Sequence, residues 1–268
     1  MHILLTNDDG VHAPGLMKLA AALAEHHKVT VVAPDRERSA ASHSLTLGQP
    51  LLVKSIESEA PQSCRIYAVS GTPVDCIRVG LDPLIDSPVD LIVSGINNGA
   101  NLGTDISYSG TVHAAMEGAV CGYPAVAFSL RIAPADQKHS ARGRFDRAAS
   151  MAAAFIANLP EDLLQGTPVF NVTFPASDTP AGTRVCMQGR SVYDTVFKTQ
   201  DDPFGRTFYW VCAVKNPSDY NDRFKTDVYW SDRNYITITP LDWNATMSSM
   251  LDPLKEQAEK RDLFTMQA

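Results

Sequence analysis

The sequence predicts an α/β fold: a Rossmann-like, doubly wound and mostly parallel β-sheet, followed by a C-terminal β-hairpin arm and a terminal helix. Two observations predict the sheet. Short apolar runs alternate with helix-like segments through the first 130 residues. These runs are apolar at successive positions, which is typical of strands buried on both faces of a parallel sheet. Beyond residue 130 the pattern changes to separated strand-like runs with polar, Gly- and Pro-containing loops, and these predict the arm.

The expected strands and helices follow from hydrophobic periodicity and residue composition. We expect strands at residues 3–6, 29–33, 66–69, 90–94, 125–129 and 169–174, and helices at residues 16–25, 73–81, 111–121 and 145–159. Further strands at residues 184–187, 207–214 and 235–239 are interpreted as hairpins or an arm, and residues 248–262 as a charged helix. Because no linker or repeat divides the chain, we expect a catalytic core at residues 1–180 and an extension, not an independent domain, at residues 181–268.

Composition excludes several classes of protein. The chain has 268 residues, 44% of them hydrophobic, and a net charge of -7. A negative balance argues against a sequence-independent grip on duplex nucleic acid, which relies on clustered Lys and Arg. No apolar run approaches the ~18 residues of a membrane span. The early aspartates argue against an export signal, and five scattered cysteines without CxxC spacing are typical of reduced thiols, so we expect a cytoplasmic protein.

Polar loops follow three of the expected strands. An Asn-Asp-Asp-Gly turn lies at residues 7–10, an Arg- and Ser-rich loop at residues 34–44, and a Gly- and Asn-rich loop at residues 95–105. In a doubly wound sheet, ligands bind at the carboxyl ends of the strands, where the strand order reverses. We therefore expect these three loops to meet at one edge of the sheet.

The first two loops carry candidate metal ligands. Adjacent carboxylates at Asp8 and Asp9 repel each other unless a cation or hydrogen bonds offset the repulsion. Oxygen ligands suit a hard divalent ion such as Mg²⁺ or Mn²⁺. Ser39 could add a hydroxyl, and Arg36 or Arg38 could meet a phosphate. Each loop also has a plain structural interpretation, the first as an Asp-Gly turn and the second as a solvated charged loop.

The third loop leads into a helix start that is typical of an anion site. Its glycines and asparagines allow backbone N–H groups to approach a ligand closely. Ser109, Gly110 and Thr111 open the next helix, where unpaired N–H groups and the helix dipole favour a phosphate. The loop has neither the GxxxxGK[ST] pattern nor the GxGxxG fingerprint.

Together the loops predict metal-assisted hydrolysis of a phosphomonoester. Asp8 or Asp9 could assist proton transfer, and the residues do not say which. A phosphatase with an aspartyl nucleophile would place its acids as DxD, whereas here they are adjacent. The alternative from another class is a non-catalytic nucleotide-binding or sensor protein. For His12, His43 and His113 we favour surface or structural roles.

The same residues resemble the SurE family, the stationary-phase survival proteins that act as 5′- and 3′-nucleotidases. The matching motifs lie at residues 3–15, 32–39, 71–76, 94–103 and 108–112. The resemblance implies a Rossmann-like core and a hydrolase with phosphatase activity on nucleoside monophosphates. It also implies one divalent ion, Mg²⁺ or Mn²⁺, per subunit, and a dimer or tetramer with exchanged C-terminal arms.

The resemblance also implies site residues. The cation would be held by Asp8, Asp9, Ser39 and Asn97, and the same two aspartates with Asn97 would be catalytic. Substrate phosphate would lie near Asn97, Asn101 and the helix start, Ser109, Gly110 and Thr111.

Two positions depart from the family pattern. Ala40 replaces the glycine usual after the ligand serine, and Asn234 replaces a glycine before Tyr235. The C-terminal half resembles the family only in patches, chiefly Thr226-Asp227 and residues 235–241. The metal site is therefore more firmly implied than the exchange of arms.

Overall fold

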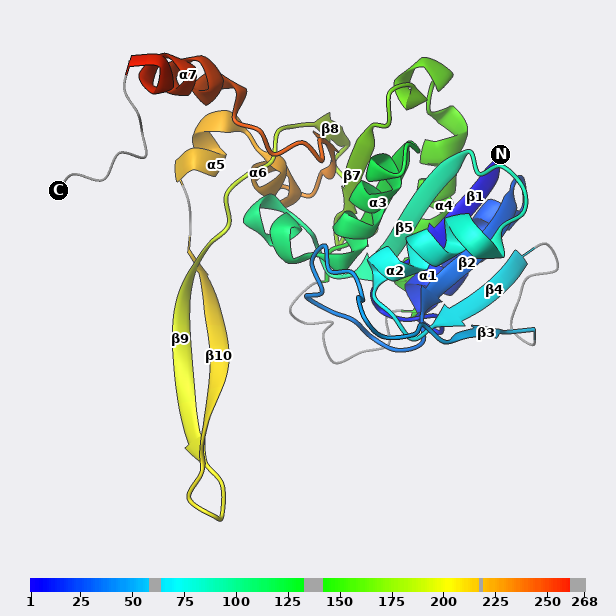
Figure 1. Ribbon diagram of the computed structural model, residues 1–268, viewed down its shortest axis with the longest axis horizontal. Helices are drawn as coiled ribbons and strands as arrows, with labels where there is room; N and C mark the ends of the chain where they lie inside the picture. Colours follow the sequence, from blue (N-terminus) through cyan, green and yellow to red (C-terminus); the bar gives the residue numbers. More distant parts are fainter. Residues whose placement is uncertain (58–63, 133–141, 217–218, 261–268) are drawn as a thin grey trace.

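The computed structural model describes residues 1–57, 64–132, 142–216 and 219–260. Figure 1 shows a twisted sheet flanked by helices, with a long hairpin projecting from the body. The strands are β1 (His2–Thr6), β2 (Lys28–Pro34), β3 (Val53–Ser55), β4 (Cys64–Val69), β5 (Leu91–Asn98), β6 (Ala125–Leu130), β7 (Val169–Phe174), β8 (Thr183–Val185), β9 (Val192–Asp201), β10 (Thr207–Asn216) and β11 (Ile236–Leu241). The α-helices are α1 (Pro14–Ala24), α2 (Pro73–Val79), α3 (Gly110–Val120), α4 (Arg142–Asn158), α5 (Asp219–Phe224), α6 (Asp227–Ser231) and α7 (Leu251–Lys260).

The main sheet has nine strands in the order β3-β4-β2-β1-β5-β6-β7-β11-β8. The strands from β4 to β7 run parallel, whereas β3 is antiparallel to β4 and β11 is antiparallel to β7. The chain winds outward from β1 to β2 and β4, then returns to the other side of β1 with β5, β6 and β7. The predicted doubly wound, mostly parallel sheet is therefore confirmed, and its strand order reverses between β1 and β5.

Two helical layers cover the sheet. On one face, α1 packs against β1, β2 and β5, and α4 packs against α1, β5 and β6. Leu16, Leu19 and Phe145 are fully or almost fully buried in this layer. On the other face, α2 packs against β1 and β2, and α3 packs against β5, β6 and β7, with Ile77 and Val112 buried. Because successive strand residues face opposite layers, the strands must be apolar on both sides.

The helix start at Thr72 has the expected form. The Thr72 hydroxyl accepts the Asp75 N–H, and the Asp75 carboxylate accepts the Thr72 N–H, which is a capping box with Pro73 at the first turn. Asp75 also accepts the hydroxyl of Thr46 at 2.6 Å. This cap therefore anchors the loop that follows β2.

The C-terminal third differs from the sequence-based interpretation. Only β9 and β10 form the projecting arm, as an antiparallel pair in which Val211 faces Phe197. The strands expected at residues 184–187 and 235–239 instead become β8 and β11 and extend the main sheet. Alternate residues of β11, Thr237 and Thr239, are buried, so this strand has an inner face to pack. Residues beyond 180 therefore contribute two strands, β8 and β11, to the sheet that residues 1–180 form.

The terminal helix α7 lies away from the sheet (Figure 1), and its described residues are all exposed. The residues expected to continue it, 261–262, lie outside the described part of the chain. Within the described ranges, no helix is both long enough and apolar enough to cross a membrane.

Candidate active site

The expected site lies where the sheet reverses its winding. β1 and β5 are parallel neighbours, with Thr6 opposite Ser94. Asp8 and Asp9 therefore leave the carboxyl end of β1 beside Asn97 and Asn98 at the end of β5. The Asn98 N–H donates to the Asp9 carboxylate at 3.0 Å, which joins the two strand ends directly. The ends of β1 and β5 therefore meet at the point where the strand order reverses, as the topological rule predicts.

A cavity of about 470 Å³ opens at this position. All three polar loops contribute to its wall. The lining residues are Asp8, Asp9, Glu37, Ser39, Ala40, Asn97, Asn98, Ala100, Asn101, Asp105, Tyr108 and Ser109.

Asp8 is a buried carboxylate fixed by the start of α3. Its side chain accepts the Thr111 N–H at 3.1 Å and the Thr111 hydroxyl at 2.5 Å. A Cβ at Gly110 would lie 2.9 Å from the Asp8 Cβ, so glycine is needed for this close approach. Burial raises the pKa of Asp8, and the Thr111 bonds oppose that rise.

Asp9 lies beside Asp8 with less hydrogen bonding. Burial first, and then the negative charge of Asp8, raise the pKa of the Asp9 carboxyl to about 6, against the opposing effect of the Asn98 N–H. Two carboxylates held together in this way are an unfavourable arrangement without a nearby positive charge.

Asn97 is placed by an irregularity in β5. The register between β5 and β6 shifts between Ser94 and Asn97. A Cβ at Gly95 would lie 2.3 Å from the Phe128 carbonyl oxygen, so only glycine fits at this bend. The Asn97 amide nitrogen donates to the Gly99 carbonyl at 2.9 Å, and the amide oxygen is the atom that can bind a cation.

Ser39 reaches the cavity from the loop after β2. Its hydroxyl donates to Glu37 at 2.6 Å, and the Arg38 N–H donates to the Asp8 carbonyl at 2.7 Å, which ties this loop to the first. Ala40 has a φ of 56°, a left-handed conformation that L residues adopt at a cost of about 1 kcal/mol. The departure from glycine therefore keeps the hydroxyl in place but adds backbone strain beside it. Asn234, the second departure, also has a positive φ of 67°, which asparagine tolerates well.

The expected anion seat at the start of α3 is arranged differently from the sequence-based expectation. Ser109 lines the cavity, but its hydroxyl caps the helix by accepting the Val112 N–H. Gly110 and Thr111 do not appear in the cavity lining, and the Thr111 N–H is taken by Asp8. The carboxylate of Asp8 thus occupies the place at the helix start where a substrate phosphate was expected.

Asn101 also lines the cavity and belongs to a buried polar network. Its amide nitrogen donates to the Ser129 hydroxyl at 2.9 Å, and its carbonyl accepts the Asn171 amide at 2.8 Å. Asn101 is 8% exposed, and its two partners are almost fully buried. Its side chain is therefore held firmly at the cavity floor.

The arginines and histidines near the three loops do not line the cavity. Arg38 donates to the Ser70 carbonyl, and Arg36 is highly exposed beside Asp35. Neither lines the cavity, so the idea that one of them meets the phosphate gains no support. His43 pairs with Glu117 and His113 with the Ser109 carbonyl, which agrees with structural roles. His12 is likewise outside the lining.

The charge of the lining determines what the cavity can bind. Four carboxylates contribute to it and, among the described lining residues, no lysine, arginine or histidine does. In the described part of the chain no three His, Cys, Asp or Glu side chains form a metal-binding group. The candidate donors instead combine two carboxylates with the Ser39 hydroxyl and the Asn97 amide. This all-oxygen set fits a hard divalent cation.

The lining residues that sequence reasoning did not single out as candidates include Glu37, Asp105 and Tyr108. Glu37 lies between Arg36 and Arg38 in the Arg-rich loop, a pattern that is typical of a solvated charged loop. Tyr108 is 67% exposed at the cavity, one residue before the helix cap. Asp105 is bound by the Tyr193 hydroxyl at 2.6 Å, a contact with the start of β9 that local sequence could not indicate.

Comparison with known proteins identifies the family. The family model described as "Survival protein SurE" matches residues 3–195, which include all three loops of the cavity. The chain belongs to the SurE family. The expected resemblance is thereby confirmed.

Relatives of this SurE chain match nearly its whole length. The 5′-nucleotidase SurE of Trichormus variabilis is 43% identical over 264 residues, covering 95% of this chain and 97% of the relative. The 5′-nucleotidase SurE of Thermoanaerobacter sp. (strain X514) is 41% identical over 259 residues, covering 95% and 97%. A crystal structure of the SurE protein from Aquifex aeolicus has a TM-score of 0.78 and 32% identity, covering 96% of this chain and 100% of the other.

Proposed function

We propose that this chain is a metal-dependent phosphomonoesterase that hydrolyses nucleoside 5′- and 3′-monophosphates to nucleoside and phosphate. Its membership of the SurE family and the 5′-nucleotidase names of its relatives support this function. The observation that carries the proposal is the cavity between β1 and β5. Its lining contains paired aspartates but, among the described residues, no cationic side chain to receive a phosphate dianion. A bound divalent cation would offset the charge of the aspartates and attract the phosphate.

We further propose one divalent ion per subunit, Mg²⁺ or Mn²⁺, held by Asp8, Asp9, Ser39 and Asn97. The raised pKa of Asp8 and of Asp9 and the all-oxygen donors support this choice. When bound, the ion would supply the positive charge that polarises a phosphoryl oxygen and lowers the pKa of a water molecule.

The remaining roles are assigned to the protein's own residues. Asn97, Asn101 and Ser109 would bind and orient the substrate phosphate, because all three line the cavity. Gly110 and Thr111 would act through Asp8, which they hold in place. Both Asp8 oxygens bond Thr111, so Asp9 is the better placed carboxylate to orient the attacking water and accept its proton.

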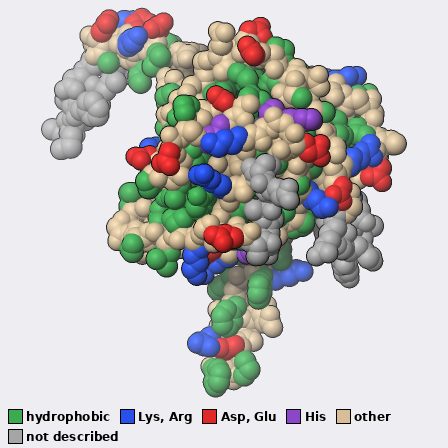
Figure 2. Space-filling model, turned by 90° about the vertical axis from the view of Figure 1, so that its right-hand side faces the viewer, with side chains coloured by type: hydrophobic (Ala, Val, Ile, Leu, Met, Phe, Trp, Pro, Cys, Tyr) green, Lys and Arg blue, Asp and Glu red, His purple; other side chains and the backbone are tan. Residues whose placement is uncertain are grey.

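We also propose that the chain forms a homodimer or homotetramer by exchanging C-terminal arms, with residues 1–180 as the catalytic core. The arm has large exposed side chains, including Phe197 at 59%, Trp210 at 62% and Phe204 at 85%. Figure 2 shows hydrophobic side chains on the part of the arm that projects beyond the body. Such a surface is typical of a protein interface. Five free cysteines support a reducing, cytoplasmic setting.

Phosphate release provides the test of the proposed reaction. The purified chain is incubated with 5′- and 3′-nucleoside monophosphates in Mg²⁺, Mn²⁺ or EDTA, and inorganic phosphate is measured. We expect release with metal and none with EDTA. If the chain binds these nucleotides in Mn²⁺ but releases no phosphate, the non-catalytic sensor is the correct alternative and the nucleotidase proposal is wrong.

A further inference from the structure

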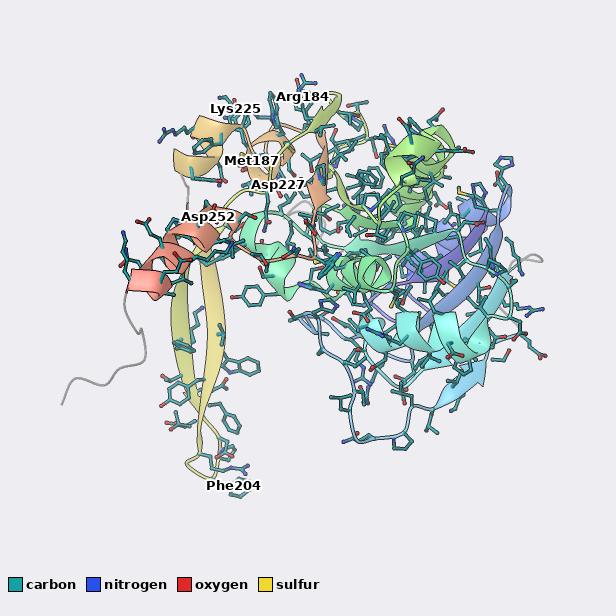
Figure 3. The ribbon with its side chains drawn as sticks, turned by 45° about the horizontal axis from the view of Figure 1, so that its top comes forward. Arg184, Met187, Phe204, Lys225, Asp227 and Asp252 are labelled. Atoms are coloured by element: carbon teal, nitrogen blue, oxygen red, sulfur yellow. The ribbon has the colours of Figure 1, made fainter. Side chains whose placement is uncertain are left out.

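The carboxylate of Asp227, at the first residue of α6, is buried outside the cavity. Its side chain is 0% exposed. Figure 3 shows Asp227 beside Met187, where α6 meets the segment that leads into β9. The Asp227 N–H donates to the Met187 carbonyl at 3.0 Å. An ionised group in such a position costs several kcal/mol unless hydrogen bonds or charges compensate it.

Backbone N–H groups from three segments converge on this carboxylate. Oδ2 accepts the Gly103 N–H at 2.9 Å. Oδ1 accepts the Gly189 N–H at 2.6 Å and the Val228 N–H at 2.7 Å. Asp227 and Gly103 are 124 positions apart in the sequence, so the carboxylate links the C-terminal segment to the loop after β5.

Other contacts reinforce this link at the same point. The Gln188 amide donates to the Gly103 carbonyl at 2.8 Å, and the Thr104 hydroxyl donates to the Ser191 carbonyl at 2.6 Å. Gly103 has a φ of 57°, and a Cβ there would lie 2.9 Å from the Ser191 hydroxyl oxygen. The N–H and the carbonyl of Gly103 are therefore both hydrogen-bonded, to Asp227 and to Gln188. A residue with a side chain at this position would collide with Ser191.

The bound loop carries two cavity residues. Asn101 precedes Gly103 by two positions, Asp105 follows it by two, and both line the cavity. Asn101 is also held by its hydrogen bonds with the Ser129 hydroxyl and the Asn171 amide. The conformation at Gly103 determines how the segment between these two side chains crosses the cavity wall.

We propose that Asp227 is a positioning residue for substrate binding: its buried carboxylate fixes the Gly103 backbone and thereby holds Asn101 and Asp105 at the cavity. The inference rests on the proposed function, because it assigns Asn101 to the substrate phosphate. Asp8, Asp9 and Ser39 lie on other segments. Asn97 precedes the bound loop at the end of β5, where its bond to the Gly99 carbonyl and the bond from the Asn98 N–H to Asp9 hold it independently of Asp227. Loss of the Asp227 contact therefore weakens nucleotide binding while the metal site remains.

An ionised carboxylate suits this position because the N–H groups of Gly103, Gly189 and Val228 all donate to it. An ionised aspartate accepts at both oxygens, whereas an asparagine has one oxygen and one NH₂ group. In Asp227→Asn, the amide oxygen can still accept from Gly189 and Val228, but the NH₂ group then faces the Gly103 N–H. Two donors facing each other leave Gly103 unpaired and push its backbone away.

The test compares wild-type protein with Asp227→Asn in the full chain. Steady-state kinetics with AMP in Mn²⁺ give KM and kcat, a Mn²⁺ titration gives the metal Kd, and hydrogen exchange follows the Gly103 amide. We expect KM to rise about tenfold or more, since small displacements of positioning groups have large effects. We expect the Mn²⁺ Kd to stay within about twofold and Gly103 exchange to accelerate about a hundredfold, because its hydrogen bond is lost. Asp222→Asn is the matched control, since its side chain is 69% exposed on α5, and it should match wild type.

A purely structural role gives a different result. If folded Asp227→Asn has wild-type KM and exchange, with kcat reduced only in proportion to the unfolded fraction, the proposal is wrong. If Asp227→Asn does not fold, Asp227→Ser decides, since one shorter hydroxyl cannot replace both carboxylate oxygens. Raised KM and faster Gly103 exchange support the proposal, and wild-type values overturn it. If wild-type protein releases no phosphate, the proposed function fails, while the Gly103 exchange still reports whether Asp227 holds the loop.

Discussion

Thr111 holds the carboxylate of Asp8 with two hydrogen bonds, one from its N–H and one from its hydroxyl. The start of α3 therefore serves as an anchor for a candidate metal ligand. This relationship explains why a helix N-terminus lies at the cavity while its first N–H groups do not face the open space. It also makes Asp8 the more rigid of the two adjacent aspartates.

Replacing Thr111 with valine should weaken metal binding. Valine keeps the shape and the backbone N–H but removes the hydroxyl bond to Asp8. A hydrogen bond to a charged group contributes about 1.5–3 kcal/mol, so we expect the Kd for Mn²⁺ to rise about tenfold or more. Isothermal titration with Mn²⁺ measures this change, with Thr207→Val on the arm as the control. An unchanged Kd would show that Thr111 does not orient a metal ligand.

Asp9→Asn should abolish activity and stabilise the metal-free protein. Phosphate release should fall by orders of magnitude, because a proposed metal ligand is lost. The raised pKa of Asp9 means that its charge opposes folding, so its removal should raise the free energy of unfolding by about 1–2 kcal/mol at pH 7.5 in EDTA. Urea denaturation measures the second effect. Asp35→Asn, at an exposed carboxylate outside the cavity, should change neither quantity.

The stability of the metal-free protein should fall as the pH rises. The pKa of Asp9 is about 6 in the folded chain, against a usual value of 3.8. Between these values the folded state keeps a proton that the unfolded state has lost. The free energy of unfolding should therefore drop between about pH 4 and pH 6, by on the order of 1–3 kcal/mol, and then level off.

Two comparisons isolate this effect. Denaturation in EDTA is measured from pH 4.5 to pH 8 for wild type and Asp9→Asn, and the wild type should show the larger drop, because only the raised pKa of Asp8 remains in the variant. Saturating Mn²⁺ should raise stability most above pH 6, where both aspartates are ionised. If the two proteins have parallel profiles, Asp9 does not control the pH dependence.

Charges on the arm should disrupt assembly. Phe197 and Val211 face each other across the hairpin, and both are exposed in the single chain, at 59% and 70%. A double change to Phe197→Glu and Val211→Glu would bury charges in any interface that covers this pair. Sedimentation velocity should show monomers for this variant and oligomers for wild type. Lys54→Glu, on the exposed strand β3, is the control and should keep the wild-type state.

The core and the position of the site could be predicted because they depend on local patterns. Continuous apolar runs marked the central strands, and the strand-end rule brought Asp8, Asp9 and Asn97 to one edge. The arm strand β9 was missed because its sequence is mostly polar and it pairs with β10 in a separate two-stranded sheet, away from the core. The contacts of Asp227 with Gly103 and of Tyr193 with Asp105 were beyond prediction, because they join segments far apart in the chain.

The position of β11 has a consequence for how the chain is made. β11 is the last strand in sequence, yet it pairs with β7 and separates it from β8. Until residues 236–241 leave the ribosome, β7 presents an open edge that another nascent chain can join. Completion of the sheet must therefore wait for the end of synthesis, and a product cut short after residue 180 should aggregate.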